Sequence, residues 1–358
     1  MTRTRLTVVV VVCVAAVLTA VSVLTDLPGR LAGDAAASEG WRDWNPSTWA
    51  RGTDEFDNPV VDGLWNQERM RSATSADQPV AQDIGVDERG LSDPEPAPVA
   101  AEPVPQSYQK NAPIIGKLFF DTPAGPSVCS ATVVADPARP GASDLVWTAG
   151  HCVHAGAEGG WFRNVVFVPS YNDEGTKTAT GQDGSAVAAA PFGTWWADGA
   201  ETSEQWIAQG TPEGGDGAAF DFAVMHVKRK GGDSSVSLEE TVGAAARVNF
   251  RAPVTQDIST IGIWGYPAAP PFDGELMYNC RARPGRLSIA PDQPSLYRVG
   301  CTMTGGSSGG GWFSEDADGE PVLISNTSIG PTTSTWLAGP RLGPEARRIY
   351  ESVSGEFD

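Results

Sequence analysis

The stretch Leu145-Val-Trp-Thr-Ala-Gly-His-Cys152 says more about the fold than any other part of the chain. Its first three residues form an apolar run typical of a buried strand, and Ala-Gly predicts a tight turn directly after it. That turn carries His151, and Cys152 can tie it to another strand through a disulfide. Cys129, which opens the run Cys-Ser-Ala-Thr-Val-Val, is the upstream cysteine able to do so. Taken alone, His151 is explained equally well as a half-buried structural histidine.

A second turn lies in Thr304-Gly-Gly-Ser-Ser-Gly-Gly310. Its composition is that of a flexible linker. However, Cys301 precedes it and the apolar run Val322-Leu-Ile324 follows, so we expect the glycines to lie inside the fold. Glycines let the backbone bend sharply around Ser308. The N–H groups of Gly306 and Ser308 can then point at one spot, as an oxyanion hole requires.

A third element, Phe220-Asp-Phe-Ala-Val-Met-His-Val227, predicts a strand that carries one carboxylate among apolar neighbours. Burying Asp221 is costly without a partner. A histidine Nδ1–H is a suitable partner, because it leaves Nε2 free to take a proton from a serine hydroxyl. A strand-edge aspartate in water is the plainer interpretation. Asp216, in the Gly-rich loop just before, is the nearby rival, but a flexible loop fixes a tautomer poorly.

Four motifs resemble those of the trypsin-like (chymotrypsin-fold) serine peptidases, in the same order along the chain: Cys129-Ser-Ala-Thr, Thr148-Ala-Gly-His-Cys152, Asp221-Phe-Ala-Val and Gly306-Ser-Ser-Gly-Gly310. Three further runs resemble the secreted bacterial branch related to glutamyl endopeptidases: Met303–Gly310, Phe167–Tyr171 and Gly265–Pro267. The resemblance covers roughly residues 110–345.

The resemblance implies an all-β fold of two antiparallel six-stranded β-barrels, at about residues 110–230 and 231–345, with a short C-terminal helix. His151 and Asp221 would come from the first barrel and Ser308 from the second. They would act as general base, orienting carboxylate and nucleophile of a serine endopeptidase that forms an acyl-enzyme. Its partners would be protein or peptide substrates, and it would need no cofactor.

Two other interpretations compete with this one. His154 lies three residues after His151 and suggests a metal pair, but no further ligand cluster accompanies the two, so we expect no metal. A catalytically silent peptidase-fold binding protein at the cell surface is the competing functional class. The intact set of three candidate residues argues against it.

Two departures from the family pattern affect the turn around the serine. Ser307 stands where many relatives carry an aspartate that pairs with a newly freed α-amino group, so Ile114-Ile-Gly116 only resembles an activation terminus. Gly311 stands where proline usually follows. We therefore expect activity not to depend on one particular new N-terminus.

The resemblance places Thr302 at the floor of the specificity pocket. It places the strand that carries Ser325, Asn326 and Ser328 on the pocket wall. All four side chains are neutral, so the pocket offers no charge for Lys or Arg. No histidine lies on this wall, so a glutamate preference could rest only on hydroxyl groups, and small or uncharged side chains fit as well.

Four cysteines outside the apolar N-terminal run form an even set that allows three pairings. We expect Cys129–Cys152, which would fix the loop of the histidine, and Cys280–Cys301. The second bridge would brace the segment that leads into the serine turn.

The first 37 residues are expected to be a signal peptide or a signal anchor, because residues 6–25 are uncharged and follow two arginines. The run is close to the roughly 20 residues that span a bilayer as a helix. Cleavage would release a secreted protein, whereas an uncleaved run would attach the chain to the membrane. Both outcomes put the rest of the chain outside the cytosol.

Residues 38–107 are acidic and end in a Pro-rich stretch, which predicts a removable pro-region or linker of a zymogen. The peptidase domain would then be 108–358. Tryptophans in this region, Trp65 among them, leave open that part of it packs on the domain.

The composition excludes one class of partner. The 358 residues contain 25 Lys+Arg and 44 Asp+Glu, and the net charge of -19 would repel the phosphate backbone of a nucleic acid. With 41% hydrophobic residues the chain can bury a core, while 41 Gly and 28 Pro favour turns over long helices.

Overall fold

The computed structural model describes residues 55–85, 91–173, 189–229 and 235–357. All of them belong to the compact unit Asn45–Asp358. The expected signal or anchor at residues 1–37 lies outside the described residues. None of the helices that are described is long and apolar enough to cross a membrane.

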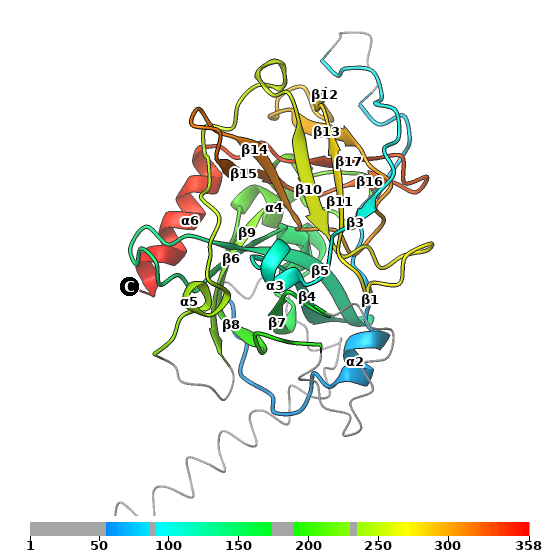
Figure 1. Ribbon diagram of the computed structural model, residues 1–358. Coiled ribbons are helices and arrows are strands. Elements are labelled where there is room, and N and C mark those ends of the chain that lie inside the picture. Colours follow the sequence, from blue (N-terminus) through cyan, green and yellow to red (C-terminus); the bar gives the residue numbers. More distant parts are fainter. Residues whose placement is uncertain (1–54, 86–90, 174–188, 230–234, 358) are drawn as a thin grey trace, which may run out of the picture. The chain divides into compact units, whose positions relative to one another are not determined.

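Six strands close the first barrel in the order β5-β4-β7-β8-β9-β6, with β6 paired back onto β5 (Figure 1). All these pairs are antiparallel. Consecutive residues such as Leu118, Phe119 and Phe120 in β4 are all fully buried. Side chains on both faces of the strand are therefore covered, which explains the continuous apolar run. The strands are β4 (Ile115–Thr122), β5 (Gly125–Val134), β6 (Leu145–Thr148), β7 (Arg163–Pro169), β8 (Trp195–Thr202) and β9 (Ala223–Arg229).

The second lobe consists of short strands around one core that contains Ile263, Val299 and Trp312. Hydrogen bonds group these strands into a sheet ordered β15-β14-β10-β11 and a sheet ordered β12-β13-β17. An isolated bridge pairs Ile329, three residues after the end of β15, with Ala338 of β17. The strands are β10 (Ile261–Gly265), β11 (Tyr278–Ala282), β12 (Gly285–Leu287), β13 (Leu296–Gly300), β14 (Gly311–Glu315), β15 (Pro321–Asn326) and β17 (Trp336–Gly339).

The expected all-β class is therefore confirmed, and the first barrel has the expected six strands. The second lobe differs in detail, because ladders between strands of three to six residues end before they close into one continuous ring.

The described part of the N-terminal region packs along both lobes, and its removal stays a prediction. β1 (Thr74–Ser75) pairs with β5, β2 (Pro79–Val80) with β16 (Gly330–Pro331), and β3 (Glu102–Pro103) with β11. The indole N–H of Trp65, just before α2 (Gln67–Ser72), donates to a first-barrel carbonyl. The described part of this region covers the domain, which is the packing that its tryptophans left open in the sequence.

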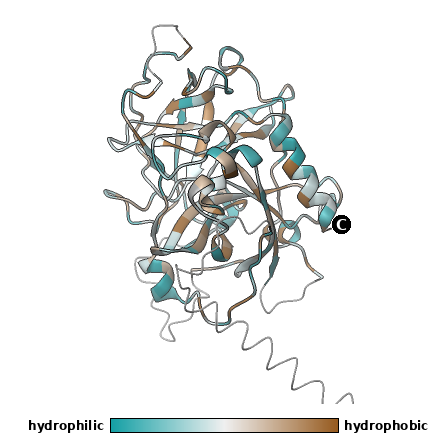
Figure 2. Cartoon of the chain, turned by 180° about the vertical axis from the view of Figure 1, so that it is seen from behind, coloured by the Kyte–Doolittle hydropathy of each residue, from teal (hydrophilic) through white to brown (hydrophobic). Residues whose placement is uncertain are grey.

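The C-terminal helix, α6 (Pro344–Glu356), starts with proline in its first turn, where the missing N–H is not needed. It buries Ile349 and Val353 against first-barrel residues, and Figure 2 shows the mixture of hydrophilic and hydrophobic residues along it. The expected short C-terminal helix is therefore present. The other helices are short: α3 (Tyr108–Asn111), α4 (Glu204–Gln209), α5 (Leu238–Val242), and the 3-10 turns η2 (Gly150–Cys152), η3 (Gly156–Glu158), η5 (Ala218–Phe220) and η6 (Thr255–Asp257).

Candidate active site

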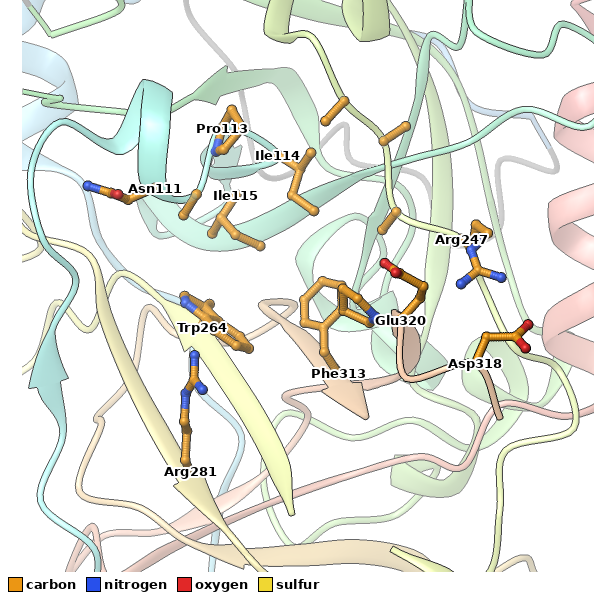
Figure 3. A pocket seen from close by; sticks show the side chains of 15 residues that line it. Asn111, Pro113, Ile114, Ile115, Arg247, Trp264, Arg281, Phe313, Asp318 and Glu320 are labelled. Atoms are coloured by element: carbon orange, nitrogen blue, oxygen red, sulfur yellow. The ribbon is translucent and has the colours of Figure 1, made fainter. Parts of the chain in front are cut away.

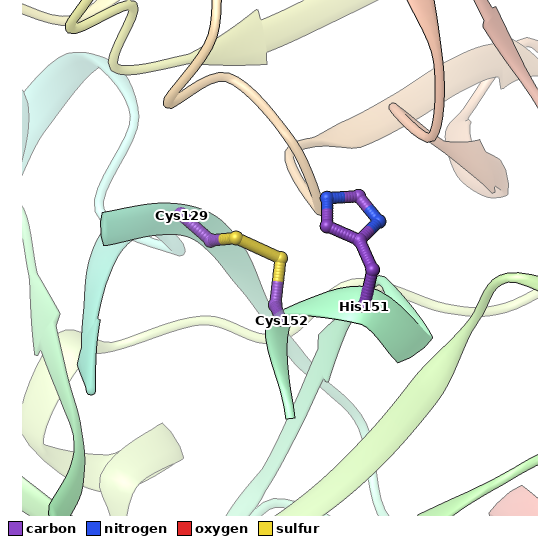
Figure 4. Close-up of side chains that lie close together, drawn as sticks. All are labelled: Cys129, His151 and Cys152. Carbon is purple, nitrogen blue, oxygen red and sulfur yellow. A yellow bond between two sulfur atoms is a disulfide. The ribbon is translucent and has the colours of Figure 1, made fainter. Parts of the chain in front are cut away.

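His151 lies in η2, the 3-10 turn directly after β6. Glycine is needed at position 150, because a Cβ there would come within 2.9 Å of the ring of Trp206. A disulfide between Cys129 and Cys152 ties the turn to β5, and Figure 4 shows this bridge beside the imidazole. The turn is thus held from both sides, by the bridge and by close packing.

The ligand atoms of Cys129, His151 and Cys152 lie within 4.8 Å of one another. Sulfurs that are bonded to each other are not thiolates, and the thiolate is the form that binds metal. The chemistry of this donor set therefore fits a structural brace for His151 and does not fit a metal site.

Asp221 follows η5 and is fully buried. Its Oδ2 lies 2.7 Å from His151 Nδ1, and its Oδ1 accepts from the backbone N–H of His151 at 2.8 Å. The carboxylate therefore favours the imidazole tautomer that carries its proton on Nδ1. The buried Nε2 of His151 has no hydrogen-bond partner within the described structure and is left to accept a proton. The strand begins at Ala223, so Asp221 precedes it, whereas the sequence predicts Asp221 within it.

Two side chains of the second lobe hold Asp221 in place. Ser328 Oγ donates to Oδ2 of the aspartate at 2.5 Å. Asn326 Nδ2 donates to the Asp221 main-chain oxygen at 3.0 Å, and Asn326 Oδ1 accepts from the indole of Trp147 at 3.0 Å. The sequence predicts both side chains on the wall of the specificity pocket; in the structure both bridge the two lobes, and Ser328 also lines the cavity beside Ser308. Asp216 makes none of the described contacts with His151.

The turn around Ser308 packs directly against the strands that lead to His151. Ser130 N–H donates to the main-chain oxygen of Ser308 at 2.7 Å. A Cβ on Gly309 would lie 2.1 Å from Thr148 Oγ1, so only glycine permits this approach. Ser308 is 5% exposed and lines a cavity together with Ser328, the residue that donates to Asp221. Ser308 of the second lobe therefore lines the same cavity as Ser328, a hydrogen-bond partner of the Asp221 that holds His151.

Gly306 has φ +92°, a left-handed conformation that favours glycine. The carbonyl of Gly305 accepts from Ala268 N–H at 2.6 Å. Because the C=O and N–H of one peptide point in opposite directions, the Gly306 N–H points away from Ala268. Neither this N–H nor that of Ser308 is donated to a backbone carbonyl in the described part of the chain. Neither predicted oxyanion-hole group is therefore used by the backbone, although the Asp77 carboxylate lies against the Gly306 N–H.

The cavity beside Ser308 has a volume of about 320 Å³. Of the four residues expected in the specificity pocket, Ser328 lines it, whereas Thr302, Ser325 and Asn326 do not appear among its described lining residues. Thr302 is engaged by the N-terminal region, since its hydroxyl accepts from Ala101 N–H at 2.9 Å. Other neutral residues line the cavity, including Met303, Thr304, Thr332 and Ser334.

One residue at this cavity is not predicted from the sequence. Asp77, from the N-terminal region, is part of the lining. It stands alone in a polar run, Ser75-Ala-Asp-Gln78, which carries no motif and no periodicity. Its position depends on strand pairing far along the chain, and the sequence offers no signal for that.

A larger cavity of about 680 Å³ lies away from these residues. Figure 3 shows Ile114, Trp264 and Phe313 around it, with Arg281 at its side. Ile114 therefore lines an apolar cavity whose described lining does not include Ser308. Ser307, where relatives carry the activating aspartate, donates its hydroxyl to the Thr304 carbonyl at 2.7 Å.

The remaining histidines are structural. His154 is 1% exposed, its Nδ1 accepts from Gly156 N–H at 3.0 Å, and burial lowers its pKa to about 4. His226 lies 2.6 Å from Asp198 and stacks on Phe357.

No protein-family model matches this sequence, and no curated protein matches it. Solved structures do. A thermostable serine protease, AL20, from an extremophilic microorganism is 32% identical, with a TM-score of 0.54 over 68% of this chain and 98% of its own. Protease Anisep from Arthrobacter nicotinovorans is 28% identical, with a TM-score of 0.53 over 71% of this chain and 99% of its own. At 32% identity over almost the whole of AL20, the likeness extends to the family, and this chain belongs to the trypsin-like (chymotrypsin-fold) serine peptidases.

Proposed function

We propose that this protein is a secreted serine endopeptidase that uses Ser308, His151 and Asp221 as a catalytic triad. The observation that carries the proposal is the buried pair of Asp221 and His151 Nδ1 at 2.7 Å. This pair leaves the buried Nε2 of His151 without a partner, and Ser328, which also holds Asp221, lines the cavity that contains Ser308. Hydrogen bonds between catalytic groups are often loose before substrate binds, so the free Nε2 is compatible with the role.

In the first half of the reaction, Ser308 Oγ attacks the carbonyl carbon of the substrate while His151 Nε2 takes the hydroxyl proton. The negative charge that develops on the carbonyl oxygen is stabilised by the N–H groups of Gly306 and Ser308. The imidazolium then gives its proton to the leaving amine. The C–N bond breaks and an acyl-enzyme ester remains on Ser308.

In the second half, a water molecule takes the place of the amine. His151 removes a proton from the water as it attacks the ester carbonyl, and returns that proton to Ser308 Oγ as the C–O bond breaks. Asp221 keeps the imidazole oriented throughout and stabilises its charged form. Its burial and its three side-chain oxygen contacts support this role.

The cavity beside Ser308 supports a preference for uncharged side chains before the cleaved bond. Apart from Asp77, its described lining residues carry no charge. Met303 supplies an apolar surface, and Thr304, Thr332 and Ser334 supply hydroxyl groups.

Two disulfides support an extracytoplasmic location, because such bonds persist in oxidising compartments. Together with the expected signal sequence, they favour export followed by removal of an N-terminal region, as in a zymogen. Released protein and protein held by an uncleaved anchor both fit.

Labelling with a fluorophosphonate probe, run to its end point, tests the proposal. We expect full labelling of the wild-type protein and of Ser307→Ala, and none of Ser308→Ala. The Ser307 variant is the matched control, since its hydroxyl is bonded to a carbonyl of its own turn. A chain that stays unlabelled while folded would instead be the silent binding protein.

A further inference from the structure

Residues 74–80 run from the first barrel to the second lobe and pass the turn that carries Ser308. At one end, β1 pairs with β5, and Ala76 N–H donates to Val128 O at 3.2 Å, one residue before the disulfide that braces His151. At the other end, β2 pairs with β16, which follows Ser328 closely. Backbone pairing therefore holds the segment on both sides of the cavity that contains Ser308.

Asp77 lies midway between these two anchors. Its carboxylate is so close to Gly305 that a Cβ there would be 1.7 Å from Asp77 Oδ1. Ser75 Oγ donates to the same carboxylate at 3.0 Å, which fixes its direction. Asp77 as a whole is exposed to solvent, while its carboxylate faces the turn that carries Ser308.

Two of the groups that act on Asp77, His151 and the Gly306 N–H, belong to the candidate active site. Burial raises the pKa of the Asp77 carboxyl group, whereas the Ser75 hydroxyl, the nearby His151 and the backbone N–H of Gly306 each lower it. The Gly306 N–H is one of the two donors that the reaction needs for its oxyanion. A carboxylate oxygen of the chain itself thus lies against one of the two N–H donors proposed to stabilise the transition state.

We propose that residues 74–80 inhibit the enzyme in the intact chain by placing the Asp77 carboxylate at the oxyanion hole. This inference rests on the proposed function and concerns the regulation of the same site. While the segment is docked, a substrate carbonyl cannot reach the Gly306 N–H. Cutting or displacing the segment frees the hole without any change in the triad.

The docked group also explains how the segment avoids being a substrate. The oxygen near Gly306 belongs to a side-chain carboxylate and not to a peptide carbonyl. A carboxylate carries a full negative charge shared by both oxygens, so its carbon is a poor target for a serine oxygen. Asp77 can therefore occupy the hole without being attacked.

The test compares the uncut chain with two variants, Asp77→Ala and Asp83→Ala. Asp83 is the matched control, because it is an exposed carboxylate six residues further along the same region. The readout is the initial rate of labelling by diisopropyl fluorophosphate, whose phosphoryl oxygen needs the same hole, with the intact chain verified by mass spectrometry. We expect Asp77→Ala to react at least tenfold faster than wild type, and Asp83→Ala to react at the wild-type rate.

A second readout does not depend on catalysis. In a Ser308→Ala background, where the chain cannot cut itself, Asp77→Ala should speed amide hydrogen exchange at residues 74–80 and 305–307, and Asp83→Ala should not. Unchanged exchange would overturn the docking.

The outcomes separate the two proposals. Equal labelling rates in wild type and Asp77→Ala, with labelling lost in Ser308→Ala, would overturn the inhibition alone. Absence of labelling in every chain would overturn the proposed function and the inhibition with it.

Discussion

His151 and Asp221 lie in turns next to strands of one closed barrel, whereas Ser308 lies in the turn that connects β13 and β14, two strands of separate sheets. In the first case, continuous ladders and a fully buried carboxylate fix the geometry. In the second, the position of the turn relies on cross-links such as Cys280–Cys301 and on contacts with the first barrel. The barrel strands thus fix the position of His151, whereas a disulfide and contacts with the first barrel fix the position of Ser308.

The largest expected effect tests whether the two lobes form one catalytic unit. Ser308→Ala and His151→Ala should each lower kcat by about 10⁶, and Asp221→Asn by about 10⁴, because the three groups act together. Ester hydrolysis by the processed enzyme measures this. Near-normal turnover of Ser308→Ala together with a dead Ser307→Ala would reassign the nucleophile.

A smaller effect should follow from opening the bridge of the second lobe. Cys280→Ala/Cys301→Ala should lower kcat about 10- to 100-fold, because displaced oxyanion donors each cost about 2.7–4 kcal/mol of barrier when lost completely. The loop spans 21 residues, so the entropic estimate of lost stability is about 3 kcal/mol. Activity is measured well below the melting temperature of the variant, so that folded protein is compared with folded protein. Unchanged kcat in the folded variant would show that the turn does not need the bridge.

Asn326 tests the contact between the lobes. Asn326→Ala should lower the free energy of unfolding by about 2–3 kcal/mol, because it leaves the buried indole N–H of Trp147 and the Asp221 carbonyl without their partner. Asn279→Ala is the control, since that amide makes one exposed hydrogen bond at 3.3 Å and should change stability by less than about 0.5 kcal/mol. Chemical denaturation measures both. If both variants lost the same small amount of unfolding free energy, the Asn326 contacts would not stabilise the protein more than the exposed Asn279 bond, and other contacts would hold the lobes together.

The smallest effect concerns a histidine beside the first barrel. His154 has its pKa lowered to about 4 by burial, so the unfolded chain binds more protons between pH 4 and about 6.5, and stability falls as the pH drops through that window. From pH 7 to 5.5 the loss should be about 1 kcal/mol. His154→Asn keeps an acceptor near Gly156 N–H and should lose this slope. A slope that persists in the variant would place the titration elsewhere.

The sequence predicts the parts of the site that depend on local chemistry. The turns around His151 and Ser308 need glycine at fixed positions, and Gly150, Gly306 and Gly309 are visible as such in the sequence. The all-β class follows from the short apolar runs between Gly, Pro and Asp. Both kinds of signal are local, so they survive without knowledge of distant neighbours.

The parts that the sequence does not predict depend on distant partners. From the sequence, Asn326 is predicted to be a pocket residue. In the structure its amide instead bonds the indole of Trp147 and the carbonyl of Asp221, which are far away in the sequence. β1 and β2 are two residues long and carry no alternating pattern, so their pairing is decided by the edges they meet. Asp77 follows from that pairing.

The attachment of residues 74–80 to the domain that they cross sets how strong their docking must be. A tethered segment has an effective concentration at its site on the order of millimolar, whatever the dilution of the protein. A segment with a Kd of about 10 µM would therefore occupy the cavity beside Ser308 about 99% of the time while it is attached. Once the segment is cut away and diffuses into dilute medium, the same Kd leaves the cavity beside Ser308 almost always empty. Weak docking thus gives tight control before the cut and lasting release after it.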